Sequence, residues 1–438
     1  MTSTCATLRI LVLAAVALVA TLLVHVAYTS KRAADRRPGR RLETTRTPAL
    51  LDMLAAAAAE LAWDWRVADG GGTCSWHNFT PSGSIHGNAS ICLRGTADLL
   101  ADHVRKNGQW AECADLPVML AAGHGSGVSG GSSAGGTPLF VDVGANVGTC
   151  TLHMLLATDA DVVAFEPGGD NLKYASQTFL RLADGSDRGD GAVLPEARRR
   201  LLLLRAGVGA TAFEQSLHQA VGNAGHAVIG VAPKQYAPLG HVPPQRVVVR
   251  PLDEMLWPAA RRDAGVPPPR IALLKLDVEG YECNALAGMR HLLKAGAIAA
   301  FKLEVFDTLL QLQGCSAVAL QRTLVRAGYT LHRADNDPRA TPTGPALAAE
   351  RLHATTVGEP YNLWCVYQPG PPSEVDSSAP MPSTLQMAEE ADGVVATAAA
   401  APAGRGEWRD RRRGARMMTR SKRNRRLFEH EEAAGANG

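Results

Sequence analysis

Short apolar runs alternate with amphipathic stretches through the central part of the chain. The strand-like runs are PLFVDVG, DVVAFEP, RLLLLRAGV, IALLKLDVEG and AIAAFKLEVF, with two later pieces, YTLHRA and YNLWCVY. Helical patterns lie between them, namely VGTCTLHMLLA, DNLKYASQTFLRLA, YECNALAGMRHLLKAG and SAVALQRTLVRAG. Continuous apolar strands separated by helices are typical of a parallel sheet that is covered on both faces. The pattern therefore predicts a doubly wound α/β domain.

Two further segments interrupt this alternation before IALLKLDVEG. GHAVIGVA and QRVVVRPLDEML indicate an inserted strand pair followed by a short helix. Residues 184–199 are predicted to form a loop insertion, and 231–245 a second one. Such loops shape a binding pocket, but nothing in their residues names a ligand.

Changes in composition predict the domain boundaries. Residues 121–136 (AAGHGSGVSGGSSAGG) form a flexible Gly/Ser linker, so the catalytic domain is expected at 137–369, after a stem region at 31–136. The chain beyond is rich in Pro, Ser, Ala and Glu and ends in a basic run, which predicts a disordered basic tail at 370–438.

The first 30 residues are predicted to be a signal anchor. Residues 10–28 are apolar apart from Thr21 and His25, which is long enough to span a bilayer. A cleaved signal peptide or an organelle-targeting presequence are the alternatives. The basic residues after the span favour a cytosolic location for the rest of the chain. The sequons at Asn78 and Asn88 favour a location in the secretory lumen instead. The expectation is a single-pass membrane protein of the Golgi or secretory pathway, anchored by its N-terminal helix, with a luminal catalytic domain.

Composition and charge limit the class of protein. Hydrophobic residues make up 46% and charged residues 20% of the chain, which is enough for a full core. The net charge is +3, but residues 405–426 carry +9 and 31–46 carry +5, so the remainder carries −11. An acidic body argues against a catalytic domain that grips nucleic acid. The basic tail could bind nucleic acid, an import receptor or an acidic membrane, or could simply be solvated.

Eight cysteines are scattered along the chain, and none shows C-x-x-C spacing. A zinc ribbon or a thioredoxin-type redox pair is therefore not indicated. Cys74, Cys92 and Cys113 could contribute disulfides in an extracytoplasmic protein, although their pairing cannot be read from the sequence.

The turn VDVGANVGT follows the first strand of the α/β pattern, where ligands bind in doubly wound sheets. Gly144 and Gly148 allow a tight bend, and Asn146 tolerates unusual dihedrals. The second glycine of the dinucleotide fingerprint G-x-G-x-x-G is missing, so a cofactor without a pyrophosphate fits better. Asp142 would repel a phosphate but could meet the amino group of a methionine-type ligand.

An acid follows the second strand about twenty residues later. Glu166 can accept both hydroxyls of a ribose, and Asn171 lies at the start of the next helix. Taken singly, these residues are equally consistent with a cap, turn glycines and an exposed acid. In strand-turn-helix-strand order they indicate a nucleoside site.

The blocks VDVGANVGTCTL, AFEPGGDNL and LLKLDVEGYECNALAGM, followed by FKLEV, resemble the FkbM-type methyltransferase family over about residues 138–333. The resemblance implies a Rossmann-like class I methyltransferase sheet of seven strands with an antiparallel last strand. It also implies S-adenosyl-L-methionine as the methyl donor and a hydroxyl acceptor on a glycan or a small natural product. The chain departs from the family at Ala210, where an acidic or amide residue near the adenine is common. The implied cofactor-binding residues are Asp142, Gly144, Asn146, Gly148 and Glu166, to which the position of Asn171 adds a sixth.

The same resemblance makes Lys275, Asp277 and Glu279 the candidate catalytic group. Methyl transfer to an alcohol needs a group that accepts the hydroxyl proton, and Asp277 is the expected base. Lys275 would lower the pKa of Asp277 or orient the substrate. Glu279 would bind an acceptor hydroxyl or join Asp277 around a divalent ion, although no metal site is predicted. The alternative interpretation is a structural ion pair that ends a strand.

Two other functions compete with an O-methyltransferase. An NAD-linked oxidoreductase shares the strand-turn-helix and the ribose acid but needs the missing glycine. A catalytically inactive binding module could retain the same fold. The intact KLDVEG weighs against loss of activity, while Ala210 leaves that possibility open.

Overall fold

The computed structural model describes residues 50–66, 73–95, 98–125, 136–185, 193–220, 223–231, 243–334 and 360–368. The predicted signal anchor, the Gly/Ser-rich stretch 126–135 and the predicted tail lie outside these residues. So do residues 186–192 of the first predicted loop insertion and residues 232–242 of the second.

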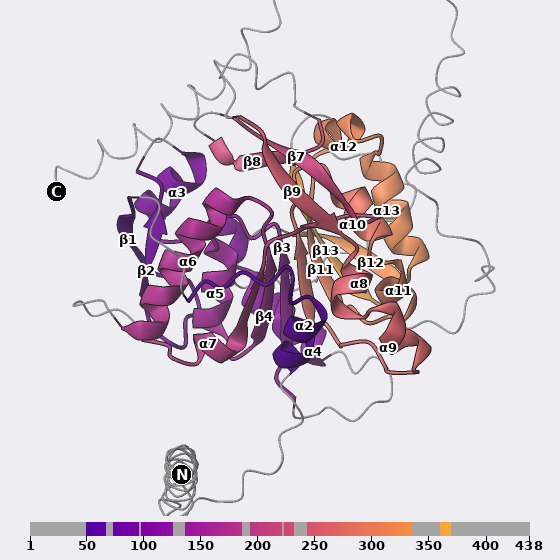
Figure 1. Cartoon of the computed structure of the whole chain (residues 1–438), viewed down its shortest axis with the longest axis horizontal. Helices are drawn as coiled ribbons and strands as arrows, with labels where there is room; N and C mark the ends of the chain where they lie inside the picture. Colours follow the sequence, from indigo (N-terminus) through magenta and orange to yellow (C-terminus); the bar gives the residue numbers. More distant parts are fainter. Residues whose placement is uncertain are drawn as a thin grey trace, which may run out of the picture.

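A seven-stranded sheet forms the centre of the molecule (Figure 1). The last strand along the chain, β13, runs antiparallel to both of its neighbours, β11 and β12, and the remaining neighbours pair in parallel. The α/β class expected from the alternation is confirmed. The strands in spatial order are β12 (Tyr329–Ala334), β13 (Tyr361–Tyr367), β11 (Ala300–Val305), β10 (Leu273–Leu276), β3 (Leu139–Val143), β4 (Asp161–Phe165) and β5 (Leu201–Leu204).

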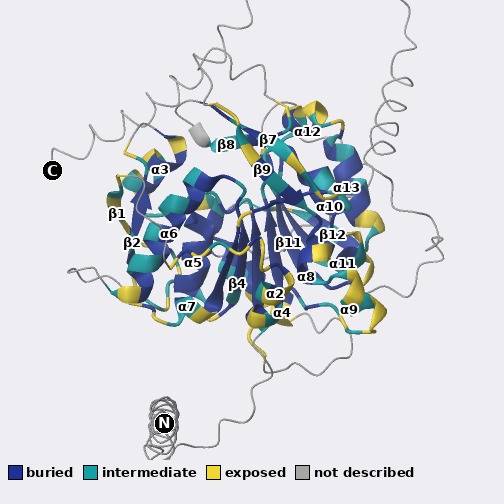
Figure 2. Ribbon diagram, in the orientation of Figure 1, coloured by how far each residue is buried: buried dark blue, intermediate teal, exposed yellow. Residues whose placement is uncertain are grey.

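The central strands form because their residues are apolar on both faces. Every residue of β3 and β10 is buried, as expected for parallel strands covered on both sides (Figure 2). Successive side chains point to opposite faces. Val141 and Leu274 therefore join one core cluster, while Phe140 and Leu273 join the other.

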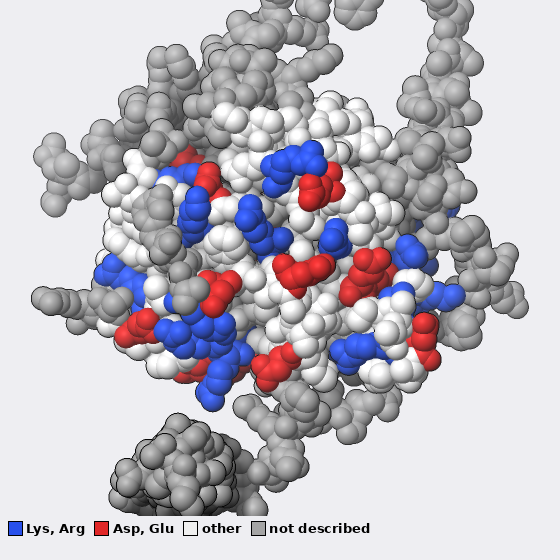
Figure 3. All heavy atoms as spheres, viewed as in Figure 1, with Lys and Arg blue, Asp and Glu red and all other residues white. Residues whose placement is uncertain are grey.

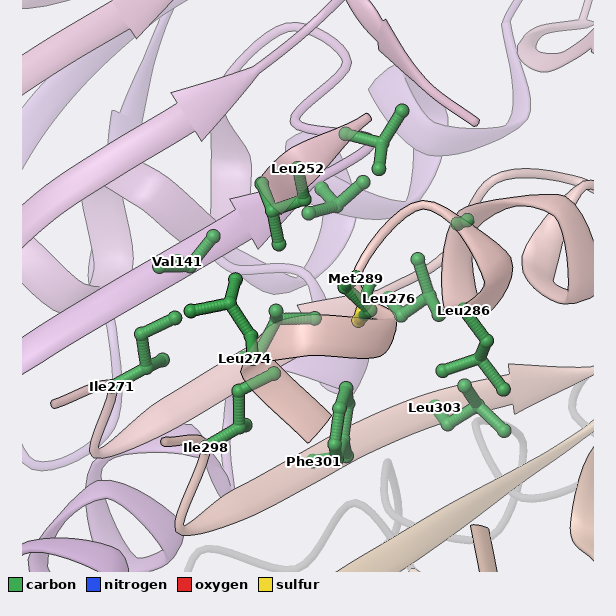
Figure 4. Packing of buried hydrophobic residues seen from close by; sticks show 14 of the residues in the cluster. Val141, Leu252, Ile271, Leu274, Leu276, Leu286, Met289, Ile298, Phe301 and Leu303 are labelled. Carbon is green, nitrogen blue, oxygen red and sulfur yellow. The ribbon is translucent and has the colours of Figure 1, made fainter. Parts of the chain in front are cut away.

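Helices cover both faces of this sheet. The first core cluster packs β-strand side chains such as Leu276 and Phe301 against Leu286 and Met289 of the chain after β10 (Figure 4). The second cluster packs the opposite face against α5 and α6. The helices of residues 136–334 are α5 (Thr149–Ala157), α6 (Gly169–Asp184), α7 (Ala197–Arg200), α8 (Leu252–Leu256), α9 (Ala259–Asp263), α10 (Glu282–Ala287), α11 (Arg290–Lys294), α12 (Asp307–Leu312) and α13 (Ala317–Arg326).

A second, four-stranded sheet contains the inserted strands. The predicted strands GHAVIGVA and QRVVVR exist, but they do not pair with each other, because β7 lies between them and is antiparallel to both. Strand β7 was not predicted, because polar residues recur along it and leave no continuous apolar run. In spatial order the strands are β6 (Gly207–Val208), β9 (Gln245–Arg250), β7 (Phe213–Ala220) and β8 (Asn223–Ile229).

The chain before the Gly/Ser-rich stretch packs on the central sheet. Residues 61–63 pair with the outer edge of β5, since the amide of Trp63 donates to Leu203 and the amide of Arg205 donates to Leu61. Trp65 and Phe79 are fully buried in the second core cluster. The predicted boundaries remain a prediction, but this part of the stem shares the core of the domain. Its elements are α2 (Leu50–Ala57), β1 (Ser75–Phe79), β2 (Ala89–Leu93), α3 (Leu99–Asn107), the 3₁₀ turn η1 (Ala111–Cys113) and α4 (Leu116–Gly125).

Three disulfides join parts of the described chain. They link Cys74 to Cys92, Cys113 to Cys150, and Cys283 to Cys315. The second of these connects η1 to the first turn of α5. The partner of Cys113 therefore lies on the far side of the Gly/Ser-rich stretch, which the sequence alone did not indicate.

Charges of both signs lie in small groups over the face shown in Figure 3. On this face, the described residues form no continuous basic tract.

The localisation expected from the sequence needs correction. Within the ranges that the structure describes, no helix is both long enough and apolar enough to cross a membrane. The segment 10–28, on which the expectation of a single-pass, luminal protein depended, lies outside those ranges.

Candidate active site

A cavity of about 240 Å³ opens at the carboxyl ends of the central strands. The ends of β3, β4, β10 and β11 form its floor, and α3, η1 and the β7–β8 hairpin form its walls. Helix α3 and strand β8 touch each other near the cavity. The site predicted from the first strand-turn-helix is therefore part of a larger enclosure.

The glycine turn after β3 brings the backbone close to the cavity. Gly144 has φ +90°, and a Cβ there would lie 1.8 Å from the carbonyl oxygen of Asp277. Only glycine fits at this position. Asn146 lines the cavity with φ +53°, whereas Gly148, at φ +85°, caps α5 and faces Phe179 instead.

Glu166 lies just after β4 and organises this half of the cavity. One carboxylate oxygen accepts from the Asn146 amide at 2.8 Å; the other accepts from the Gly168 amide at 2.7 Å and from the Asn171 side chain at 3.2 Å. Burial raises the pKa of Glu166 to about 6, although these hydrogen bonds favour its charged form. Glu166, Asn146 and Asn171 thus meet at one place, and their role in binding a cofactor stays a prediction.

Lys275 links two of the predicted acids. Its Nζ lies 3.1 Å from Asp277 and 3.6 Å from Asp142, and it also donates to the Gly144 carbonyl at 3.3 Å. Burial by itself lowers the pKa of Lys275, but the carboxylates of Asp277 and Asp142 outweigh it and the net pKa is raised. Lys275 is therefore a permanent cation in the lining of the cavity.

Asp142 lies behind the cavity and not in its wall. It is fully buried and accepts a hydrogen bond from Thr151 at 2.7 Å. Burial raises its pKa, against the opposing effect of Lys275. Its nearest cation is Lys275, so Asp142 reaches the cavity through that side chain.

Glu279 belongs to the turn after β10 and pairs with a residue that the sequence analysis missed. Its carboxylate lies 3.0 Å from Nδ1 of His226, which β8 places in the cavity wall. The hydrogen bond to Glu279 is the main cause of a raised pKa for His226. Burial raises the pKa of Glu279 itself. The signal for His226 was weak, because a lone histidine in a strand indicates no partner.

Three acids form a cluster at the carboxyl ends of β10 and β11. One oxygen each from Asp277, Glu279 and Glu304 all lie within 4.8 Å of one another. Burial and the neighbouring acids raise the pKa of Glu304 well above its ordinary value. Such a set of oxygens could accept hydrogen bonds from hydroxyl groups or hold a divalent cation. Glu304 lies in the FKLEV block but received no role from the sequence.

Trp110 and Glu112, just after α3, also line the cavity. Burial is the main cause of a raised pKa for Glu112, and the charge of Asp277 adds to it. Neither residue was predicted, because the segment was read as a stem outside the domain. No periodic pattern in it marks a binding residue.

Residues 142–313 match the model of the methyltransferase FkbM domain. The match includes the glycine turn, Glu166, His226 and the Lys275–Asp277 pair. This part of the chain is similar to FkbM methyltransferase domains. The resemblance noted from the three sequence blocks is thereby confirmed, and Trp110 and Glu112 fall outside the FkbM domain so defined.

Among solved structures, the chain is similar to a crystal structure of methyltransferase FkbM from Methylobacillus flagellatus KT. The two are 17% identical with a TM-score of 0.27, and the match covers 55% of this chain and 46% of that one. The chain thus spans about half the length of that protein. No curated protein matches the chain.

Proposed function

We propose that the protein is an S-adenosyl-L-methionine-dependent methyltransferase that methylates a hydroxyl oxygen. The match to the FkbM methyltransferase domain carries this proposal. The strand order of the central sheet, with its antiparallel β13, fits the class I methyltransferase arrangement that the resemblance implies.

The half of the cavity around Glu166 is the proposed donor site. The two oxygens of Glu166 suit the two hydroxyls of a ribose, and Gly144 lets the backbone approach the amino-acid part of the donor. Ala206, Gly207 and Val208 line the wall near Ala210, so the adenine would meet apolar groups there. Asp142 would act through Lys275.

Asp277 is the proposed base. When bound, S-adenosyl-L-methionine supplies an electrophilic methyl group on a positively charged sulfur. Asp277 would accept the proton of the acceptor hydroxyl as that oxygen takes the methyl group from the donor sulfur. Lys275 holds Asp277 in place, and Glu279 and Glu304 can accept hydrogen bonds from other hydroxyls of the acceptor.

The acceptor is proposed to be a small molecule or a glycan with several hydroxyl groups. The four acids Glu112, Asp277, Glu279 and Glu304 around the cavity would repel a phosphate backbone, which supports the expectation of no nucleic acid partner. An NAD-linked oxidoreductase is disfavoured by the absent second glycine of its fingerprint.

Calorimetric titration of the full chain with S-adenosylhomocysteine tests the donor site. We expect Glu166→Gln to weaken binding about tenfold or more, because charge-assisted hydrogen bonds to the ribose are lost. The exposed Glu254→Gln on α8 is the matched control and should bind as the unchanged protein does. A folded protein that binds no S-adenosylhomocysteine would contradict the proposal.

Asp277→Asn separates binding from chemistry. It should keep S-adenosylhomocysteine affinity within a few-fold and reduce transfer of a radiolabelled methyl group to a panel of methyl glycosides and phenols by roughly 100-fold or more. Donor binding in the unchanged protein without transfer to any compound would favour the inactive binding module.

A further inference from the structure

We propose that the turn before the Gly/Ser-rich stretch supplies the acceptor side of the active site, with Glu112 beside the reacting atoms and Lys302 as the residue that positions it. The proposal rests on the donor site proposed above. It assigns part of the reaction to residues that precede the matched FkbM domain.

The cavity places Glu112 with the catalytic group. Glu112 and Trp110 line the same enclosure as Asp277, Glu279 and Glu304. The charge of Asp277 raises the pKa of Glu112, and the charges of Lys275 and Lys302 lower it. Asn146 and Glu166 line the same cavity, so Glu112 shares one enclosure with the proposed donor site.

Lys302 holds the turn η1 against the central sheet. It projects from β11, is only 2% exposed, and donates to the Glu112 carbonyl at 2.5 Å and to the Asp115 carboxylate at 2.6 Å. Asp115 is equally buried. Burying the charge of a lysine in a central strand costs free energy unless the charge is paired. Lys302 is therefore stable in this position only when η1 contacts the sheet and supplies Asp115.

The Cys113–Cys150 disulfide fixes the same turn from the side. Cys150 lies in the first turn of α5 and in the cavity wall, directly after the glycine turn. One covalent link to α5, which follows the glycine turn, and one buried ion pair to β11, which carries Glu304, therefore hold η1 in place.

The side chains of Trp110 and Glu112 offer an apolar and a charged surface to an acceptor. The Trp110 side chain donates a hydrogen bond to the Glu112 carboxylate, which orients it. The Trp110 ring packs edge-on against His103, with 4.9 Å between centroids, and so presents a rigid apolar wall. Glu112 adds a negative charge next to the position of the transferred methyl, where the donor is positively charged.

Two donor analogues test this without a known acceptor. S-adenosylhomocysteine is uncharged at its sulfur, whereas sinefungin carries a protonated amine at the position of the methyl-bearing sulfonium. In calorimetric titrations of the full chain at pH 8, Glu112→Gln should weaken sinefungin binding about tenfold and change S-adenosylhomocysteine binding less than twofold. Asp102→Asn, an exposed acid on α3, is the matched control and should leave both affinities unchanged.

The outcomes separate the two proposals. If the unchanged protein binds neither analogue, the donor site itself is wrong. If both analogues bind but Glu112→Gln leaves their affinity ratio unchanged, or weakens both equally, Glu112 does not face the reacting atoms and this proposal is overturned.

Lys302→Met tests the positioning role. It should change the affinity ratio in the same direction as Glu112→Gln, together with faster amide exchange at residues 110–115. Should Lys302→Met fail to fold, Trp110→Phe provides the second variant, because it removes the hydrogen bond that orients Glu112 and should lower sinefungin affinity by a smaller factor. An unchanged ratio in the folded variant would contradict the role assigned to that residue.

Discussion

Glu282 shows how a single carboxyl group supports the turn after β10, which carries the proposed base. It is 1% exposed, and one of its oxygens accepts from the amides of Val278 and Gly280, at 3.1 and 3.2 Å. Burial raises its pKa to about 8, and the charge of Asp277 adds to this. Glu282 is therefore mainly protonated at neutral pH, and it holds the turn that presents Glu279.

The stability of the protein should depend on the ionisation of Glu282. A group whose pKa is raised by folding stabilises the protein fully below its unfolded pKa of about 4.5, and this contribution is lost as pH rises toward about 8. The Glu282→Gln variant lacks this ionisable group. Its free energy of unfolding, measured relative to that of the unchanged protein, should therefore rise by on the order of 3 kcal/mol between pH 5 and pH 8. Urea unfolding across this range measures the difference.

Glu254→Gln is the matched control for this series, because Glu254 is exposed on α8. A difference in unfolding free energy between Glu282→Gln and the unchanged protein that stays constant with pH would contradict the raised pKa.

At the scale of elements, apolar periodicity predicted the central sheet well. Strands β12 and β13 coincide with the predicted runs YTLHRA and YNLWCVY, because their residues pack on a large buried core. Strand β7 was missed because its sequence FEQSLHQA is largely polar and its position between β8 and β9 depends on pairing. Pairing between segments far apart in sequence has no local signal.

The Cys113–Cys150 disulfide should stabilise both the fold and the donor site. It joins residues 37 apart, so replacing both cysteines by serine should lower the unfolding free energy by about 4 kcal/mol. The Cys74–Cys92 pair, 18 residues apart, is the control, with an expected loss of about 3 kcal/mol. Only the first variant should also weaken S-adenosylhomocysteine binding, because Cys150 lies in the first turn of α5 and lines the cavity. Urea unfolding and calorimetry measure these effects. If both variants bound S-adenosylhomocysteine equally well, the proposed effect of the Cys113–Cys150 disulfide on the donor site would be contradicted.

At the scale of the whole molecule, the position of the site was predicted better than its extent. The glycine turn, Glu166 and the KLDVEG block meet at one cavity because the carboxyl ends of parallel strands share an edge. Trp110, Glu112 and His226 were missed, because each reaches the cavity through contacts that no repeating pattern encodes. The composition change at 121–136 was read as a boundary, yet the core continues across it.

A fragment that begins at residue 137 should therefore not fold. It lacks Trp65, Phe79, Ile91, Leu116 and Met119, all fully buried against the second face of the sheet. Five such side chains contribute roughly 10 kcal/mol, at about 1.5–3 kcal/mol each, which equals the net stability of an ordinary domain. Near-ultraviolet circular dichroism and thermal unfolding measure the loss. Removal of 370–438 is the matched control, and a cooperative transition in the 137–369 fragment would contradict this expectation.

The contact of η1 with the cavity has a consequence for how such a protein can diversify. The donor-binding loop and the wall that carries Trp110 and Glu112 are encoded on opposite sides of a Gly/Ser-rich stretch. A recombination breakpoint in that stretch would exchange the upstream wall and leave the donor loop intact. Under the proposed function, this exchange would change acceptor preference in a single genetic step, provided that the incoming segment keeps an acid to pair with Lys302 and a cysteine to pair with Cys150.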